Sequence, residues 1–280
     1  MPPDSLLPEA RWRARLALAF ERRGERSVLA SRVHDGPLVV QKPLHPEGPE
    51  VCHAIVVHPP AGIAGGDELV MQVCAREGAS ALLTTPGAAK WYRSAGAWAR
   101  SRVRIEARAR ATVEWLPQET IVFDAALADI EWEAHLEGDA TLIAWDIVRL
   151  GRTASGERFG KGRLRSTLRI WRDARLQWVE RARIEPASGV ASAAAGLAGE
   201  PVFATMVCAA PHIEDDWLAR WRQAKPVAGE AAVTRLPGLL VARYRGASTE
   251  AVRDYFCALW AAIRPLATGR EAVAPRIWST

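Results

Sequence analysis

Residues 102–110 read RVRIEARAR, and this stretch indicates the fold class because polar and apolar residues alternate along its whole length. In an extended strand successive side chains point to opposite faces. The arginines and Glu106 would therefore lie on one face, and Val103, Ile105 and the alanines on the other. One face is expected to be wet and the other buried.

The same alternation recurs on both sides of this stretch. It predicts strands at 131–137 and 163–165, and shorter apolar runs bounded by Gly and Pro predict strands at 54–57, 69–73 and 81–85. No helical pattern separates successive strands, which argues against a βαβ architecture. Residues 1–280 are expected to form a single, mainly β domain.

Helical spacing appears only in the last third of the chain. After Ser248 as N-cap, apolar residues at 252, 256, 259, 260 and 263 follow a helical period, and Pro265 is expected to end that helix. A shorter helix is predicted at about 215–224. The small-residue stretch 186–199 is either a loop or a loosely specified helix.

Composition places the chain among globular proteins. It has 280 residues, 49% of them hydrophobic, and a net charge of +5. Its four cysteines form no C-x-x-C pair, so the sequence indicates neither a zinc knuckle nor a redox dithiol. The N-terminus has no charge-free apolar segment for a secretory signal, and no apolar run approaches the roughly 20 residues that span a bilayer. We expect a cytoplasmic protein without membrane partners, less ordered over residues 1–25.

Charge is segregated along the predicted strands. Residues 149–183 contain eleven basic and three acidic residues, a balance of +8, whereas 124–139 contain six acidic residues and no Lys or Arg. Such patches either steer protein partners or form solvated strand faces. The basic segment, with Trp171 and Trp178, also permits a β-protein that binds single-stranded RNA.

The motifs of common enzymes are missing. The turn HPPAGIAGGD at 58–67 is rich in Pro and Gly but matches no phosphate loop, and neither a Ser-His-Asp order nor a G-x-S-x-G elbow is present. His53 and His58 are more typical of structural histidines than of metal ligands. Glu131, Glu133 and His135 would share one strand face, where they form either an exposed divalent-ion site or a solvated surface.

Seven longer motifs occur in order over nearly the whole chain and resemble those of the urease accessory protein UreD (UreH) family. They are QKPLHPEGP at 41–49, HPPAGIAGGD at 58–67, LTTPGAAKWYRS at 83–94, EWLPQETIVFDAA at 114–126, GRTASGERF at 151–159, LPGLLVARY at 236–244 and PRIW at 275–278. Ala61 and Ala125 depart from the pattern, since the family usually has Gly at both positions.

The resemblance implies a non-enzymatic maturation factor. Proteins of this family form a complex with UreF-type and UreG-type partners, bind apo-urease, and help insert nickel while the UreG-type partner hydrolyses GTP. The implied fold is a β-helix-like, stacked-sheet body with about two α-helices. No tightly bound cofactor and no nucleic-acid partner are implied.

A nickel route through the β body has been proposed for the family. An ion that must move on needs weak oxygen ligands in place of a tight cage. The resemblance places candidate ligands at motif positions, each of which could equally be a turn cap or a strand-end acceptor. They are Asp67, Thr84, Thr85, Glu119, Asp124 and Asp146, with Glu180 as a less secure addition.

Overall fold

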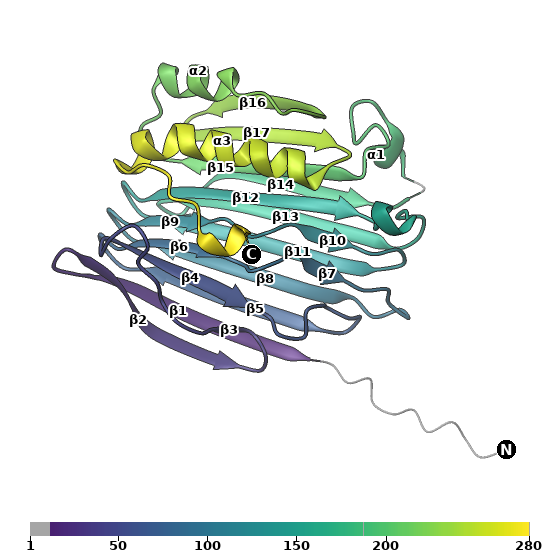
Figure 1. The fold of residues 1–280 in the computed structure, drawn as a ribbon, viewed down its shortest axis with the longest axis horizontal. Helices are drawn as coiled ribbons and strands as arrows, with labels where there is room; N and C mark the ends of the chain where they lie inside the picture. The colour runs from purple at the N-terminus through teal and green to yellow at the C-terminus, as the bar shows by residue number, and fades with distance from the viewer. Residues whose placement is uncertain (1–11, 187, 280) are drawn as a thin grey trace, which may run out of the picture.

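The computed structural model describes residues 12–186 and 188–279, which form two stacked β-sheets with a helical layer over one of them (Figure 1). The first sheet has seven strands in the order β14-β13-β11-β8-β5-β1-β2, and the second has ten. The main path of the ten-stranded sheet is β16-β17-β15-β12-β9-β6-β4-β3, with β10 and β7 joined beside β12. The prediction of a mainly β fold with stacked sheets is confirmed.

The strands have the following bounds. They are β1 (Arg13–Arg23), β2 (Arg26–Asp35), β3 (Val39–Val40), β4 (Val51–Val57), β5 (Glu68–Ala75), β6 (Ser80–Thr84), β7 (Ala89–Trp91), β8 (Ala99–Ala107), β9 (Thr112–Trp115), β10 (Thr120–Val122), β11 (Leu127–Leu136), β12 (Thr141–Leu150), β13 (Arg163–Arg172), β14 (Arg175–Ile184), β15 (Val202–Ala209), β16 (Glu230–Leu236) and β17 (Leu239–Gly246). The 102–110 alternation forms most of β8, but the strand ends at Ala107 because the chain turns there, with Arg110 in a left-handed conformation (φ 59°).

Parallel pairing arises here without any connecting helix. From β4 to β13 the longer strands alternate between the two sheets, so that β5, β8, β11 and β13 stack in parallel in one sheet and β4, β6, β9 and β12 in the other. Each strand of one sheet serves as the crossover for the other. The body is therefore solenoid-like.

The main hydrophobic core lies between the two sheets. In β1, for example, every second residue is buried, from Ala14 through Leu16 and Leu18 to Phe20. The parallel strands of the seven-stranded sheet repeat this alternation, with apolar residues inside and charged residues outside. Burial of these inner faces supplies the main driving force for folding.

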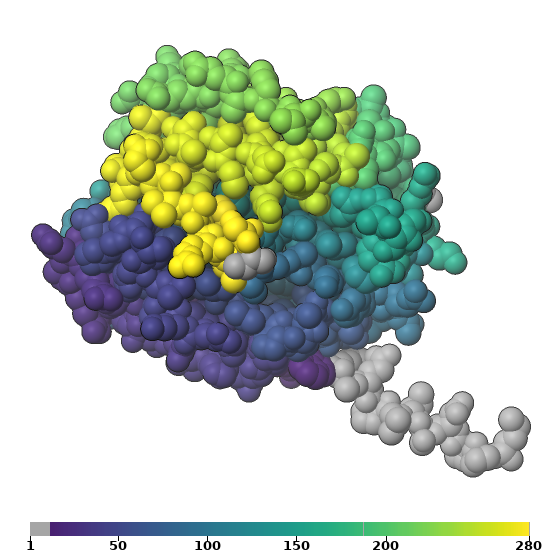
Figure 2. Space-filling model, viewed as in Figure 1, coloured from purple at the N-terminus to yellow at the C-terminus, as the bar shows by residue number. Residues whose placement is uncertain are grey.

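A second core lies between the ten-stranded sheet and the two longer helices. The helices are α1 (Gly189–Ser192), α2 (Asp215–Gln223) and α3 (Thr249–Thr268), together with the 3-10 turns η1 (Thr153–Ser155) and η2 (Arg276–Ser279). Helix α3 lies across the ten-stranded sheet, and the C-terminal segment continues over the same face (Figures 1 and 2). Its apolar residues, including Phe256, Leu259 and Ile263, are buried against that sheet.

The helix predictions are confirmed except for one end. The Ser248 side chain accepts a hydrogen bond from the Ala251 N–H (3.1 Å), as an N-cap does. Pro265, however, lies inside α3, which continues to Thr268 and ends at Gly269 with φ 71°. In the last turn proline removes only one intrahelical bond, and buried ion pairs of Arg264 hold the preceding residue in place.

The N-terminal segment 1–25, for which less order was expected, contains β1 between β2 and β5. Residues 1–11 of that segment lie outside the described residues. The stretch 186–199 contains the single-turn helix α1 followed by turns. Within 12–186 and 188–279, the helices are all too short or too polar to cross a bilayer.

Candidate functional site

A cavity of about 350 Å³ lies between the two sheets. Loops that follow β4, β6 and β9 gather there, because the carboxyl ends of parallel strands meet at one edge of the ten-stranded sheet. The beginnings of β5, β8 and β11 supply the opposite wall. The HPPAGIAGGD turn at 58–67 is one of the loops that border this cavity.

Most of the cavity wall is apolar. The seven-stranded sheet contributes Leu69, Met71 and Trp132, and the opposite side contributes Trp91 and Trp115. These side chains are nearly fully buried. Any polar group at this wall is therefore shielded from bulk solvent, and leaving it without a hydrogen-bond partner lowers the stability of the fold.

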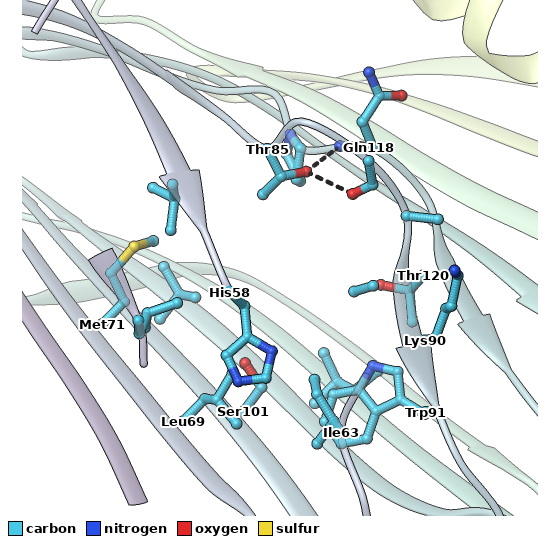
Figure 3. Close-up of a pocket in the computed structure, with 18 of the residues that line it drawn as sticks. His58, Ile63, Leu69, Met71, Thr85, Lys90, Trp91, Ser101, Gln118 and Thr120 are labelled. Atoms are coloured by element: carbon cyan, nitrogen blue, oxygen red, sulfur yellow. Dashed lines mark hydrogen bonds between the residues drawn. The ribbon is translucent and has the colours of Figure 1, made fainter. Parts of the chain in front are cut away.

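Polar side chains interrupt the apolar wall at several points (Figure 3). Thr85 donates a hydrogen bond to the Gly87 carbonyl (3.3 Å) and accepts one from the Gln118 backbone N–H (2.9 Å). His58 and Ser101 lie beside Leu69, and burial lowers the pKa of His58, with the Asp67 charge partly opposing that shift. A neutral imidazole can accept a hydrogen bond or bind a metal ion.

Asp146 is the one predicted ligand that combines cavity lining with a strongly perturbed carboxyl. It lies on the inner face of β12, next to Thr205 of β15. Burial, followed by the neighbouring Glu180 charge, raises the pKa of Asp146 from 3.8 to about 7. Glu180 itself accepts hydrogen bonds from Thr205 Oγ1 (2.6 Å) and Arg243 Nε (2.6 Å). The sheets thus enclose two adjacent carboxyl groups, one of them paired and the other without a hydrogen-bond partner among the described residues.

Asp67 and Asp124 are turn acceptors outside the cavity. Asp67 accepts hydrogen bonds from the backbone N–H groups of Ala64 (2.8 Å) and Trp12 (3.1 Å), which fixes the entry to β5. Asp124 Oδ1 accepts from Gly160 and Lys161, both at 2.8 Å. Both carboxylates thus have defined structural partners.

Thr84 and Glu119 also lie outside the cavity lining. Thr84 faces the helical layer, where its hydroxyl donates to the Leu116 carbonyl (2.6 Å) and accepts from Trp278 Nε1 (2.8 Å). Glu119 is half-buried, and its backbone carbonyl pairs with Ala89. Of the six predicted ligands, the structure therefore brings only Thr85 and Asp146 together at the cavity.

The strand face formed by Glu131, Glu133 and His135 is occupied by ion pairs. Glu131 pairs with Arg169, and Glu133 with Arg104 (2.7 Å) and His135 (3.1 Å). Over residues 12–186 and 188–279, we find no group of three or more His, Cys, Asp or Glu side chains placed to hold a metal ion. This face is therefore a charged surface on which side chains of neighbouring strands form ion pairs.

The sequence patterns did not predict a buried network of charged side chains around Arg264. Arg264 of α3 is fully buried and binds Glu114 of β9 (2.9 Å) and Glu47 (2.7 Å), and Glu47 also pairs with His53 Nε2 (2.6 Å). Trp260 Nε1 donates to the second oxygen of Glu114 (2.6 Å). These residues are too far apart in the chain for any local pattern to have joined them.

Comparison with known proteins decides the family. The family model described as UreD urease accessory protein matches residues 13–279. The chain belongs to the UreD family. It is 51% identical to the urease accessory protein UreD of Azoarcus sp. (strain BH72) over 96% of this chain and 94% of the relative, and 49% identical to that of Dechloromonas aromatica (strain RCB), with 96% and 95% covered. The UreD of Pseudomonas aeruginosa is 51% identical, again with 96% and 95% covered.

Membership supports a role in urease maturation and gives no support to the RNA-binding alternative. The two tryptophans on which that alternative depended are engaged within the fold. Trp178 is buried between the sheets, and Trp171 stacks on His135 with 5.9 Å between ring centroids. Neither ring has both faces free for a base.

Proposed function

We propose that this protein is a cytoplasmic, non-enzymatic scaffold that helps insert nickel into apo-urease, acting with UreF-type and UreG-type partners. UreD family membership over residues 13–279 supports the maturation role. In this proposal nickel is cargo, GTP enters only through the UreG-type partner, and the scaffold hydrolyses neither GTP nor urea.

The observation that carries the nickel proposal is the carboxyl group of Asp146 in the cavity between the sheets. Its pKa of about 7 gives it exchangeable protonation at neutral pH, so it can bind a divalent ion without holding it tightly. Thr85 and His58 line the same cavity and offer it a hydroxyl oxygen and an imidazole nitrogen.

The experiment compares single Asp→Asn variants in a maturation assay with the UreF-type partner, the UreG-type partner and apo-urease. Nickel per urease active site is measured alongside the denaturant midpoint of the scaffold. We expect Asp146→Asn to lower nickel loading severalfold without loss of stability. Asp129→Asn is the matched control, because Asp129 lies on the outer face, where its nearest ion pair, to Arg100, spans 3.8 Å.

The Asp67→Asn variant distinguishes a loss of nickel transfer from a loss of scaffold stability. It removes an acceptor from a turn outside the cavity, so any nickel loss should scale with its loss of stability. Equal nickel loading by the Asp146 and Asp129 variants would refute a route through the cavity. A scaffold that fails to bind its UreF-type partner would refute the wider proposal.

A further inference from the structure

The outer face of the seven-stranded sheet carries opposite charges in adjacent strands. Arginines of β8 lie beside the acidic residues of β11, which in turn lie beside arginines of β13. Arg104 pairs with Glu133 at 2.7 Å, and Arg102 with Glu131 at 3.8 Å. Over this part of the face, positive and negative charges compensate one another.

At the β13–β14 edge the positive charges are less fully compensated by acidic side chains. Four exposed arginines lie there, and we call them the basic corner: Arg163, Arg165, Arg181 and Arg183. Arg163 and Arg183 share a single carboxylate, Glu185, at 3.7 and 3.0 Å. Within the described part of the chain, Arg181 has no ion pair. Arg165 lies over the Trp98 ring, 4.2 Å from its centroid.

The strand register places two of these charges directly opposite each other. Arg165 is the cross-strand partner of Arg183 in the antiparallel β13–β14 pair. Like charges at such a position destabilise a sheet. On its other side Arg165 lies beside Asp129 of β11 and contacts Trp98, so part of its charge is compensated. Among the described residues, Arg181 has no ion pair and Arg183 shares Glu185 with Arg163, so the basic corner keeps an excess of positive charge that an external anion would neutralise.

We propose that the basic corner is a docking surface for an acidic segment of a protein partner. Guanidinium groups bind carboxylates through paired, charge-assisted hydrogen bonds. Val179, next to the corner on the same face of β14, is 41% exposed and offers an apolar contact for aliphatic side chains of that segment. This surface is on the opposite side of the seven-stranded sheet from the cavity, so it does not depend on the nickel proposal.

The same features disfavour a nucleic acid at this surface. Single-stranded nucleic acids need aromatic faces on which bases can stack. Here Arg165 covers the Trp98 ring, and Trp171 stacks on His135.

The test measures binding of a fluorescein-labelled synthetic peptide of alternating Glu and Leu by fluorescence anisotropy at about 0.15 M ionic strength, where the screening length is about 8 Å. The full-length Arg165→Glu/Arg181→Glu variant should bind about tenfold more weakly than the unmodified chain. This variant is expected to fold, since both positions are exposed and Arg181 has no ion pair to lose among the described residues. Arg165→Glu replaces a like-charge pair with Arg183 by an opposite-charge pair, which offsets the new like-charge pair with Asp129 and the lost contact with Trp98. An unchanged thermal midpoint checks that point.

The matched control is Arg158→Glu/Arg222→Glu, which makes the same change in net charge at two exposed arginines without ion pairs among the described residues. It should retain affinity within about twofold, because distant surface charges are screened. If both variants bound the peptide equally weakly, net charge alone would explain the effect, and the proposal would be overturned. Absence of peptide binding, or binding of a single-stranded RNA oligomer at this corner more tightly than the peptide, would also overturn it.

Discussion

Ala61 and Ala125 adopt left-handed backbone conformations, with φ of 59° and 60°. These are the two positions at which the family pattern usually has Gly, so the departures noted in the sequence fall on strained turns. A Cβ in this region costs roughly 1–2 kcal/mol, whereas Gly avoids that cost but loses more backbone entropy on folding. The turn motif was visible in the sequence, but its backbone angles were not.

Ala61→Gly and Ala125→Gly should therefore each raise the free energy of unfolding by about 0.5 kcal/mol, the difference between relieved strain and added entropy cost. Urea denaturation of each variant measures the change. Ala128→Gly, at a buried position in regular β11, is the control and should destabilise the protein. Destabilisation by all three variants would show that the two turns carry no strain.

The buried network around Arg264 makes a second prediction at the residue scale. Burial is the largest single contribution and raises the pKa of Glu47, but hydrogen bonds from His53 and Arg264, together with their charges, outweigh it and lower that pKa from 4.5 to about 2. Because the folded pKa is lowered, this stabilisation is present above pH 4.5 and is lost as pH falls toward 2. It corresponds to roughly 3 kcal/mol.

Urea unfolding at pH 6, 4 and 3 tests the network. Glu47→Gln should lower stability at pH 6, and the stability difference between the variant and the unmodified protein should shrink between pH 6 and 3, since Gln does not titrate. Glu50→Gln is the control, because Glu50 is exposed and, among the described residues, has one ion pair, with Arg270. An unchanged pH profile in the Glu47 variant would show that the carboxylate is not held by Arg264 and His53.

Helix α3 shows what sequence patterns can and cannot define at the level of an element. Its N-cap and buried face followed from Ser248 and from apolar spacing, but its C-terminal end did not follow from Pro265. The strands were likewise predictable from alternation, whereas their distribution between two sheets came only through the family resemblance. Alternation fixes which side chains are buried; it does not fix which strand lies beside which.

The true end of α3 should depend on Gly269. A Cβ added there would meet open space, so Gly269→Ala should cost about 1 kcal/mol from the left-handed conformation alone. Pro265→Ala should restore one backbone N–H and leave stability unchanged or higher. Chemical denaturation followed by circular dichroism measures both. Marked destabilisation by Pro265→Ala would indicate that proline is required to end or shape the helix.

At the scale of the whole molecule, the two oppositely charged segments of the sequence are neighbours. Strand β11 from the acidic segment pairs in parallel with β13 from the basic segment, so Glu133 lies opposite Arg169. Part of the apparent charge asymmetry is therefore neutralised within one sheet, whereas the basic corner keeps an excess of positive charge. Composition along the chain could not reveal this, because compensation depends on the register of strands that are about 36 residues apart.

Asp146 connects the stability of the whole fold with the proposed function. Its carboxyl pKa is raised from 3.8 to about 7, so the folded state prefers the protonated form. The stabilisation is complete below pH 3.8 and is lost as pH rises through 7, at a cost of at most about 4 kcal/mol. This dependence is opposite in sign to that of Glu47, so the two groups together favour a stability maximum near pH 4, where their titration ranges of about 2–4.5 and 3.8–7 overlap.

Asp146→Asn should consequently stabilise the protein at pH 8 and have little effect at pH 4, because the neutral amide avoids the burial of a charge between the sheets. Urea unfolding of both proteins at pH 4, 6 and 8 measures this difference. Asp129→Asn, on the outer face, should show no comparable pH-dependent gain. A stability gain combined with a loss of nickel delivery would mean that the carboxyl is retained for transfer at the expense of folding. A stability difference that does not change with pH would show instead that Asp146 titrates normally, which would remove the physical basis for its role in the cavity.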